Sequence, residues 1–245
     1  MRAERIQMEG LENTRDLGGI VNKEGKKIRE KKLLRSGALF WAKGDDLKRL
    51  YEEYELRHII DMRNAEENIG CPEPSYKDVK YVYNPIFTYR KEGITREEDV
   101  DFDQIMKDLA FQKDKIVKMM QDMYGQIASL DEAKEAYNAF IHYLLSEHEG
   151  SVLWHCSMGK DRAGIASIIV LKLLDVDEDT ILEDYLYTNT CYGFTEDRPT
   201  YYFDIVMKEY LQRYLEVTGD LDEYIEKEIG ITKAEKARFK EMYLE

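Results

Sequence analysis

The stretch "HCSMGKDRAG", residues 155–164, decides the fold of this 245-residue chain. It follows a short apolar run, "SVLW" at 151–154, and leads into a longer one, "GIASIIVLKLL" at 164–174. A short apolar run before a glycine-containing turn is typical of a buried strand, and the longer run after it favours a buried helix. The sequence therefore predicts a strand at 152–155, a turn, and a helix at 163–174.

Such a turn is suited to holding a tetrahedral oxyanion. Backbone N–H groups converge there, and the start of the helix adds unpaired donors and a partial positive charge. Gly159 and Gly164 permit close backbone approach, and Lys160 and Arg162 add full charges. Cations and a helix N-terminus lower the pKa of a thiol from about 8.5 to about 3.5–7.5. We therefore expect Cys156 to be a thiolate that attacks a bound phosphate, with Arg162 holding two phosphate oxygens.

Two other interpretations of this turn fit the sequence less well. A lone cysteine after a strand is usually a small buried apolar residue, but here five residues separate it from an arginine, within the glycine-containing turn. A nucleotide-binding P-loop requires Ser or Thr after its Gly-Lys pair. Asp161 follows Lys160 in this chain, so that motif is excluded.

Composition limits the partners. The chain has 36 Lys and Arg against 50 Asp and Glu, and its net charge is −14. An acidic protein is a poor candidate for binding nucleic acid or anionic membranes through its overall field. It has no apolar stretch that could span a bilayer, so we expect no integral membrane contact.

The cysteines and histidines bear on location and metals. Three cysteines without local pairing indicate reduced thiols and a cytoplasmic protein, and no secretory signal is visible. A secreted form without its signal peptide stays an alternative. The four histidines are scattered, with no CxxC or HExxH pattern, so we expect neither a metal site nor a cofactor.

The rest of the chain predicts an α/β fold in one domain, residues 1–245. Short strands are expected around 32–39, 57–63 and 79–87, a hairpin at 19–28 and an amphipathic helix at 131–148. The charged stretch 91–128 is interpreted as a helical insertion or lid. The remainder is helical, and Asp220-x-x-Glu223 and Thr232-x-x-Glu235 are capping-box patterns that open helices. We expect a small central sheet flanked by helices, with an extra helical lid.

The sequence resembles a known family at this point. "HCSMGKDRAG" is similar to the HCxxGKDRTG signature of bacterial tyrosine phosphatases with dual-specificity and phosphoinositide activity, which belong to the cysteine-dependent C-x5-R phosphatases. Four further segments resemble motifs of that family in the same order: "NTRDLGG" (13–19), "LLRSGAL" (33–39), "IIDMRNAEE" (59–67) and "DYLYTN" (184–189). The resemblance covers residues 10 to 240 and implies a cysteine-phosphatase-like fold.

The resemblance also implies roles for residues of the turn. Cys156 would be the nucleophile and Arg162 the ligand of the phosphate and the transition state. Backbone donors would come from Ser157, Met158, Gly159, Lys160, Asp161 and Arg162. In this family no mobile Trp-Pro-Asp loop supplies the proton, and this chain has none either, so the resemblance implies Asp161 as the leading general acid, with a charge at the helix N-terminus as its alternative role. Asp61 is a weaker candidate acid.

Other residues would support the site. Lys160 resembles the lysine linked to phosphoinositide substrates, with simple phosphate attraction as its alternative role. His155 would orient the base of the loop. Asp16, Arg35 and Arg63 would brace it through ion pairs.

One position departs from the family pattern. The family carries Ser or Thr after the arginine, where its hydroxyl binds the cysteine sulfur, and this chain has Ala163. The second chemical step is therefore in question.

The sequence thus predicts a phosphatase that acts on phosphotyrosine, with phosphoserine, phosphothreonine and phosphoinositides as further substrates. Two alternatives stay open: an inositol-polyphosphate phosphatase, and a phosphate-binding module with weak turnover. The partner is a phosphorylated protein or phosphoinositide, and the sequence does not determine the oligomeric state.

Overall fold

The computed structural model describes residues 3–88, 113–146, 148–197 and 201–245. Its sheet contains six strands, in the order β1-β2-β3-β6-β4-β5. Their bounds are β1 Glu4–Arg5, β2 Arg15–Asp16, β3 Leu33–Ser36, β4 Leu56–Asp61, β5 Lys80–Tyr83 and β6 Ser151–His155. The four strands β3, β6, β4 and β5 are parallel, whereas β1 and β2 pair antiparallel at one edge.

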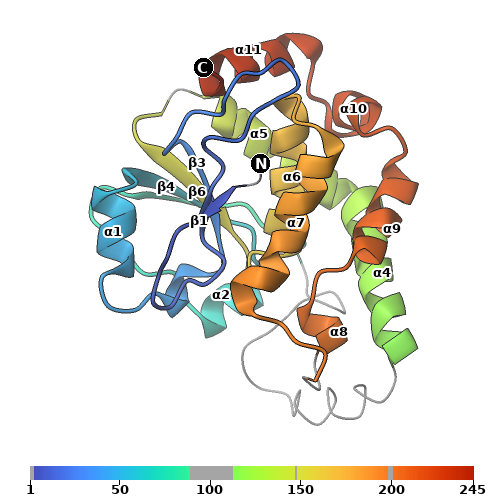
Figure 1. Ribbon diagram of the computed structural model, residues 1–245, viewed down its shortest axis with the longest axis horizontal. Coiled ribbons are helices and arrows are strands. Elements are labelled where there is room, and N and C mark those ends of the chain that lie inside the picture. The colour runs from blue at the N-terminus through green and yellow to red at the C-terminus, as the bar shows by residue number, and fades with distance from the viewer. Residues whose placement is uncertain (1–2, 89–112, 147, 198–200) are drawn as a thin grey trace.

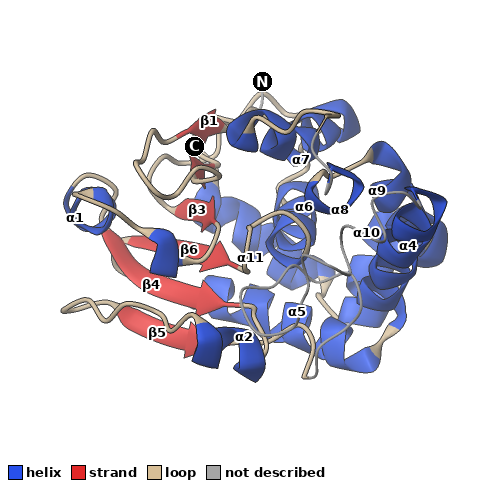
Figure 2. Cartoon of the chain, turned by 90° about the horizontal axis from the view of Figure 1, so that it is seen from below, coloured by secondary structure: helices blue, strands red, loops and turns tan. Residues whose placement is uncertain are grey.

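Helices form the rest of the regular secondary structure of the described chain. Their bounds are η1 Leu39–Trp41, α1 Asp46–Glu52, α2 Ala65–Gly70, α4 Lys113–Ser129, α5 Asp131–Leu145, α6 Arg162–Leu173, α7 Glu178–Tyr192, α8 Tyr201–Asp204, α9 Lys208–Thr218, α10 Leu221–Tyr224, the π-helical turn η2 Ile225–Ile229 and α11 Lys233–Tyr243. Figures 1 and 2 both show α6 in the middle, with the sheet on one side and the α4–α9 pair on the other. The α/β fold with a small sheet flanked by helices is therefore confirmed.

Successive side chains of β6 point to opposite faces of the sheet, and there is a hydrophobic core on each face. Val152 and Trp154 point into the large core beneath the helices, while Leu153 points into a smaller core that includes Leu50 of α1. Every residue of α6 is buried, which explains its apolar sequence all round. Because parallel strands end at the same edge, β3, β4 and β6 bring their carboxyl ends together where α6 begins.

Most of the predicted elements are confirmed within a few residues. The strands and the helices at 131–148 and 163–174 are present, and the cap at Thr232 is a full capping box. At Asp220 only the side-chain bond to the Glu223 N–H is present. Residues 91–112 of the predicted lid lie outside the described residues, and the rest of that segment is α4, which packs on α9.

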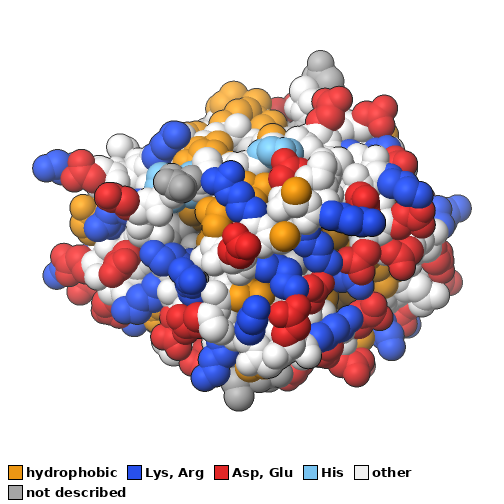
Figure 3. All heavy atoms as spheres, turned by 90° about the horizontal axis from the view of Figure 1, so that it is seen from above, with side chains coloured by type: hydrophobic (Ala, Val, Ile, Leu, Met, Phe, Trp, Pro, Cys, Tyr) orange, Lys and Arg blue, Asp and Glu red, His pale blue; other side chains and the backbone are white. Residues whose placement is uncertain are grey.

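Ion pairs attach the last helix to the body of the protein. Lys236 and Lys240 of α11 both contact Asp175, at 2.7 and 2.6 Å, and Lys236 also contacts Asp222 at 2.9 Å. Figure 3 looks onto the face where α11 lies and shows basic and acidic side chains interleaved. This face therefore presents mixed charge rather than a continuous basic patch.

None of the helices in the described parts of the chain has the length and apolar content needed to cross a bilayer.

Candidate active site

The loop between β6 and α6 turns its carbonyl groups outward. The Met62 and Ala38 N–H groups bind the carbonyls of His155 and Ser157. The His155 ring contacts the carbonyl oxygen of Cys156. The Met158 carbonyl accepts hydrogen bonds from the side chains of Asn13 and Tyr192, and the Gly159 carbonyl accepts one from Arg35. Because the carbonyls are held on the outside, the N–H groups of the same loop are left for an anion on the inside.

Gly159 is required by this path. Its φ is +66°, and a Cβ atom there would lie 2.2 Å from the carbonyl oxygen of Ser36. A side chain would therefore both strain the backbone and push the loop away from the end of β3.

The start of α6 adds further donors. Asp161 occupies the N-cap position, but its side chain makes no capping hydrogen bond. The first intrahelical bond runs from the Ile165 N–H to the Asp161 carbonyl, so the N–H groups of the first turn are not used within the helix. They supplement the loop donors beside Cys156, whose thiol is free and whose exposed fraction is 2%.

Glu67 holds the guanidinium of Arg162 end-on. Both Nη atoms of Arg162 lie 2.7 Å from the carboxylate oxygens of Glu67. Burial opposes ionisation of both groups, but their mutual attraction prevails: it lowers the pKa of Glu67 and raises that of Arg162. The Nε atom of Arg162 is buried and has no hydrogen-bond partner among the described residues. Nη2 also lies 3.5 Å from the Ser157 hydroxyl, so Nε is the donor of this guanidinium that is left for a phosphate.

Glu67 was not selected in the sequence analysis. It is the third residue of α2, where a capping box joins it to Asn64. The pattern Asn64-x-x-Glu67, directly after a strand that ends at the carboxyl edge of the sheet, is the signal that could have found it. The Ser157 hydroxyl also donates to Glu67, so this carboxylate connects two residues of the loop.

Asp161 and Lys160 bind each other. Lys160 is fully buried, and its Nζ lies 2.9 Å from Asp161 Oδ2 and 3.1 Å from the carbonyl oxygen of Phe203. Tyr124 of α4 donates to Asp161 Oδ1 at 2.8 Å. The structure therefore places Asp161 at the loop as expected, but it directs the Lys160 ammonium toward Phe203 and Asp161.

Arg35 reaches the loop, whereas Asp16 does not. Arg35 donates to the Gly159 carbonyl at 2.7 Å and to Asp184 of α7 at 2.9 Å. Asp16 instead accepts hydrogen bonds from the N–H groups of Gly18 and Lys31. Successive residues of β2 point to opposite faces, so Arg15 is the one that approaches Asp184, at 3.5 Å.

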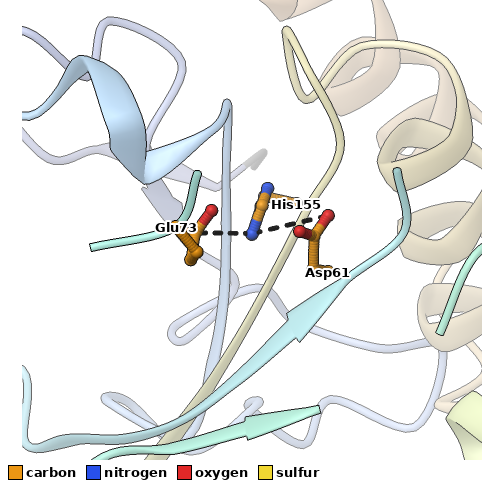
Figure 4. Close-up of side chains that lie close together, drawn as sticks. All are labelled: Asp61, Glu73 and His155. Carbon is orange, nitrogen blue, oxygen red and sulfur yellow. Dashed lines mark ion pairs between the residues drawn. The ribbon is translucent and has the colours of Figure 1, made fainter. Parts of the chain in front are cut away.

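A buried group of charges lies below the loop, next to the end of β6. Asp61 and His155 are opposite each other in the register of β4 and β6. Figure 4 shows both side chains with Glu73, which comes from the segment between α2 and β5. Arg63 contacts Asp61 and Glu73 at 2.8 Å each. Arg63 therefore contacts the carboxylates next to His155, the residue before Cys156, and not the loop itself. Glu73, which the sequence did not single out, also contacts His155.

No hydroxyl group within the described residues is hydrogen-bonded to the sulfur of Cys156. The Ser157 hydroxyl is taken by Glu67, and the Ser167 hydroxyl donates to the Ala163 carbonyl. The departure at Ala163 is therefore not compensated by these neighbouring side chains.

Comparison with known proteins agrees with this geometry. The tyrosine phosphatase family model matches residues 6–245. A protein of Cupriavidus necator named as a tyrosine-protein phosphatase is 29% identical over 184 residues, which are 75% of this chain and 63% of the relative. A tyrosine-protein phosphatase of Nostoc commune is 24% identical over 128 residues, 51% of this chain and 38% of the relative.

A third relative is the triple specificity protein phosphatase PtpB of Mycobacterium tuberculosis. It is 34% identical over 76 residues, 31% of this chain and 27% of the relative. The chain thus spans less than two thirds of the length of each of these relatives. The family match nevertheless extends over almost all of the sequence, in agreement with the arrangement of Cys156 and Arg162: the chain belongs to the tyrosine phosphatase family.

Proposed function

We propose that the protein is a phosphatase that hydrolyses phosphotyrosine through a phosphocysteine intermediate. The observation that carries the proposal is the loop 156–162, whose carbonyls are bound on the outside while Cys156 and the free Nε edge of Arg162 belong to the same short turn. The family match to residues 6–245 supports one catalytic domain over the whole chain. The three free thiols support a reducing compartment, the cytoplasm.

The reaction would proceed in two displacements. The Cys156 thiolate attacks phosphorus, and the bond from phosphorus to the tyrosine oxygen breaks as Asp161 gives that oxygen a proton. For this step the Asp161 carboxyl group must be protonated, so it cannot at the same time be the ionised partner of Lys160. Water then attacks the phosphocysteine and gives a proton back to the Asp161 carboxylate, the S–P bond breaks, and inorganic phosphate leaves. Throughout, loop N–H groups and Arg162 neutralise the charge on the equatorial oxygens, which supplies most of the rate.

A recess next to the loop favours an aromatic substrate. A cavity of about 330 Å³ is lined by Ser157 and Met158 of the loop and by the rings of Trp41 and Tyr192. Aromatic walls pack well on the ring of phosphotyrosine. The wider range of PtpB, as its name states it, supports testing phosphoserine, phosphothreonine and phosphoinositides as well. If Lys160 is to bind a phosphoinositide, its ammonium group must first leave the Asp161 carboxylate and the Phe203 carbonyl.

The test compares turnover of a phosphotyrosine peptide, a phosphoserine peptide, a phosphoinositide and an inositol polyphosphate, and traps the intermediate by acid quenching and mass spectrometry. We expect the phosphotyrosine peptide to give the highest kcat/KM and phosphate to be found on Cys156. Preference for the inositol polyphosphate would favour the alternative phosphatase. Phosphate binding with no turnover would favour the binding module.

Asp161→Asn tests the general acid. If Asp161 protonates the leaving oxygen, the variant should lose about 10²–10⁴-fold with an alkyl phosphate. It should lose far less with p-nitrophenyl phosphate, whose leaving group needs no proton. The second substrate serves as the internal control, since equal losses on both would assign Asp161 a structural role through Lys160 and Tyr124.

Ala163→Thr tests the second step. A hydrogen bond to a charged group contributes about 1.5–3 kcal/mol, so its absence from the departing sulfur should slow hydrolysis of the phosphocysteine roughly tenfold or more. The unmodified protein should then show a burst of product close to one per active site in rapid mixing. The variant should raise kcat and shrink the burst. Absence of a burst, together with no gain in the variant, would show that the second step is not limiting.

A further inference from the structure

The residue before the nucleophile belongs to a buried cluster of four charged side chains, Asp61, Arg63, Glu73 and His155. We call this set the His155 cluster. Each of its side chains has an exposed fraction of 7% or less. His155 Nε2 lies 3.3 Å from Glu73 Oε1 and 3.9 Å from Asp61 Oδ1, the two contacts that Figure 4 marks.

The surroundings of the ring determine its protonation. His155 Nδ1 lies 3.1 Å from the carbonyl oxygen of Cys156, and a carbonyl oxygen can only accept a hydrogen bond, so Nδ1 carries a hydrogen. Nε2 is buried and has no hydrogen-bond partner among the described residues, and the two carboxylates are its acidic neighbours, at 3.3 and 3.9 Å. A bare lone pair there would face the negative charge of Glu73. A hydrogen on Nε2 removes that repulsion and makes the ring an imidazolium.

The charge count leads to the same state. With His155 protonated, two cations face two carboxylates and the cluster is neutral; with a neutral ring it would carry one uncompensated negative charge in the protein interior. Burial opposes the charged ring, but Glu73 and Asp61 outweigh it and raise the pKa of His155. Burial would likewise raise the pKa of Asp61, but His155 and then Arg63 bring it to about 2.

The cluster already contains its cation. Asp61, Glu73 and His155 each offer one atom within 4.8 Å of the others, as a metal site would. However, the Arg63 guanidinium lies 2.8 Å from both carboxylates. A divalent ion would have to sit against that positive charge, so the donor set does not suit a metal.

We propose that Glu73 is a positioning residue that keeps His155 an imidazolium at neutral pH, and that this charged ring stabilises the thiolate of Cys156. The Nδ1 edge contacts the carbonyl oxygen of Cys156, while both carboxylates lie beyond Nε2, so the edge of the ring that is turned toward Cys156 is the one away from the acidic groups. The inference rests on the proposed role of Cys156. Among the described residues, the charged groups around the ring are Asp61, Arg63 and Glu73, and Tyr81 joins them through its hydrogen bond to Asp61.

The sign of the effect separates two possibilities. If Glu73 is what keeps His155 charged, Glu73→Gln lets the ring lose its proton and the thiolate loses a neighbouring cation. If Asp61 alone is sufficient, the same variant leaves an extra positive charge and makes the thiolate easier to form. The two cases shift the reactivity of Cys156 in opposite directions.

The test follows alkylation of Cys156 by iodoacetamide against pH, read by mass spectrometry of its tryptic peptide. For Glu73→Gln we expect the pH of half-maximal rate to rise by about one unit. Asp78→Asn is the matched control, since Asp78 is an exposed carboxylate in the same segment whose φ of 60° asparagine tolerates. It should leave the curve unchanged. An unchanged or lower midpoint in Glu73→Gln overturns the inference.

A second measurement needs no variant. Nitrogen-15 spectra of the unmodified protein should show both ring nitrogens of His155 protonated from pH 6 to pH 8, and a neutral ring at pH 7 overturns the inference. Stoichiometric Zn²⁺ binding that Glu73→Gln abolishes would also overturn it, because the ion would replace the proton on Nε2. None of these measurements uses a phosphorylated substrate, so a failure of the phosphatase assay is a separate result.

Discussion

Cys156→Ser is expected to lower turnover of a phosphotyrosine peptide by at least about 10⁴-fold while the protein still binds inorganic phosphate. A serine hydroxyl must lose its proton before it can attack phosphorus. The carboxylate of Asp161 is occupied by Lys160 and Tyr124, and the His155 Nδ1 donates to a carbonyl. No side chain described here is therefore arranged to take that proton. The donors that hold phosphate are backbone groups and Arg162, and the substitution leaves them in place.

The measurement is kcat/KM for the peptide, with calorimetric titration of inorganic phosphate on the same samples. Cys191→Ser is the control, because its sulfur accepts a long contact from Arg15 that an oxygen can also accept. It should keep full turnover. Cys156→Ser activity within tenfold of the unmodified protein would show that the thiolate is not the nucleophile.

The part of the site that is built from residues close together in the sequence was predictable from the sequence. The apolar run before Cys156 and the apolar run after Arg162 each form one element, and the turn between them is short. Gly159 could be identified in the same way, because its positive φ belongs to the turn itself, whereas the departure at Ala163 is visible only against the family pattern. The charges and donors of the same turn predict the roles of Cys156 and Arg162, and the resemblance to a family implies the same roles.

Contacts between distant segments were not predictable in this way. Glu67 lies 95 positions before Arg162, and Tyr124 lies 37 before Asp161. Glu67 and Glu73 are two of 50 acidic residues, and only the register of β4 against β6 gives them their partners. For Lys160 the sequence suggested a contact that the structure does not show. Its position in the turn favours contact with phosphate, but its ammonium group donates to the carbonyl of Phe203 on α8. That carbonyl belongs to a segment about forty residues away whose location the sequence does not reveal.

Glu67→Gln should have the largest effect on stability. The pair of Arg162 and Glu67 is almost fully buried, with exposed fractions of 3% and 4% for the two side chains. The amide has nearly the shape of the carboxylate but no charge, so Arg162 is left as a buried cation without its counter-ion. Removing one partner of a buried ion pair costs about 3–5 kcal/mol. Urea denaturation at neutral pH should therefore show a fall of that size in the free energy of unfolding.

Glu66→Gln is the matched control, because it changes the neighbouring exposed residue of the same helix in the same way. Its effect should stay within about 0.5 kcal/mol, as for most surface substitutions. Inorganic phosphate provides a second test, since a bound dianion would supply the negative charge that Arg162 has lost. Phosphate should raise the melting temperature of Glu67→Gln by more than it raises that of the unmodified protein. A fall below about 1 kcal/mol, with equal shifts by phosphate in both proteins, would mean that Glu67 does not hold Arg162 in place.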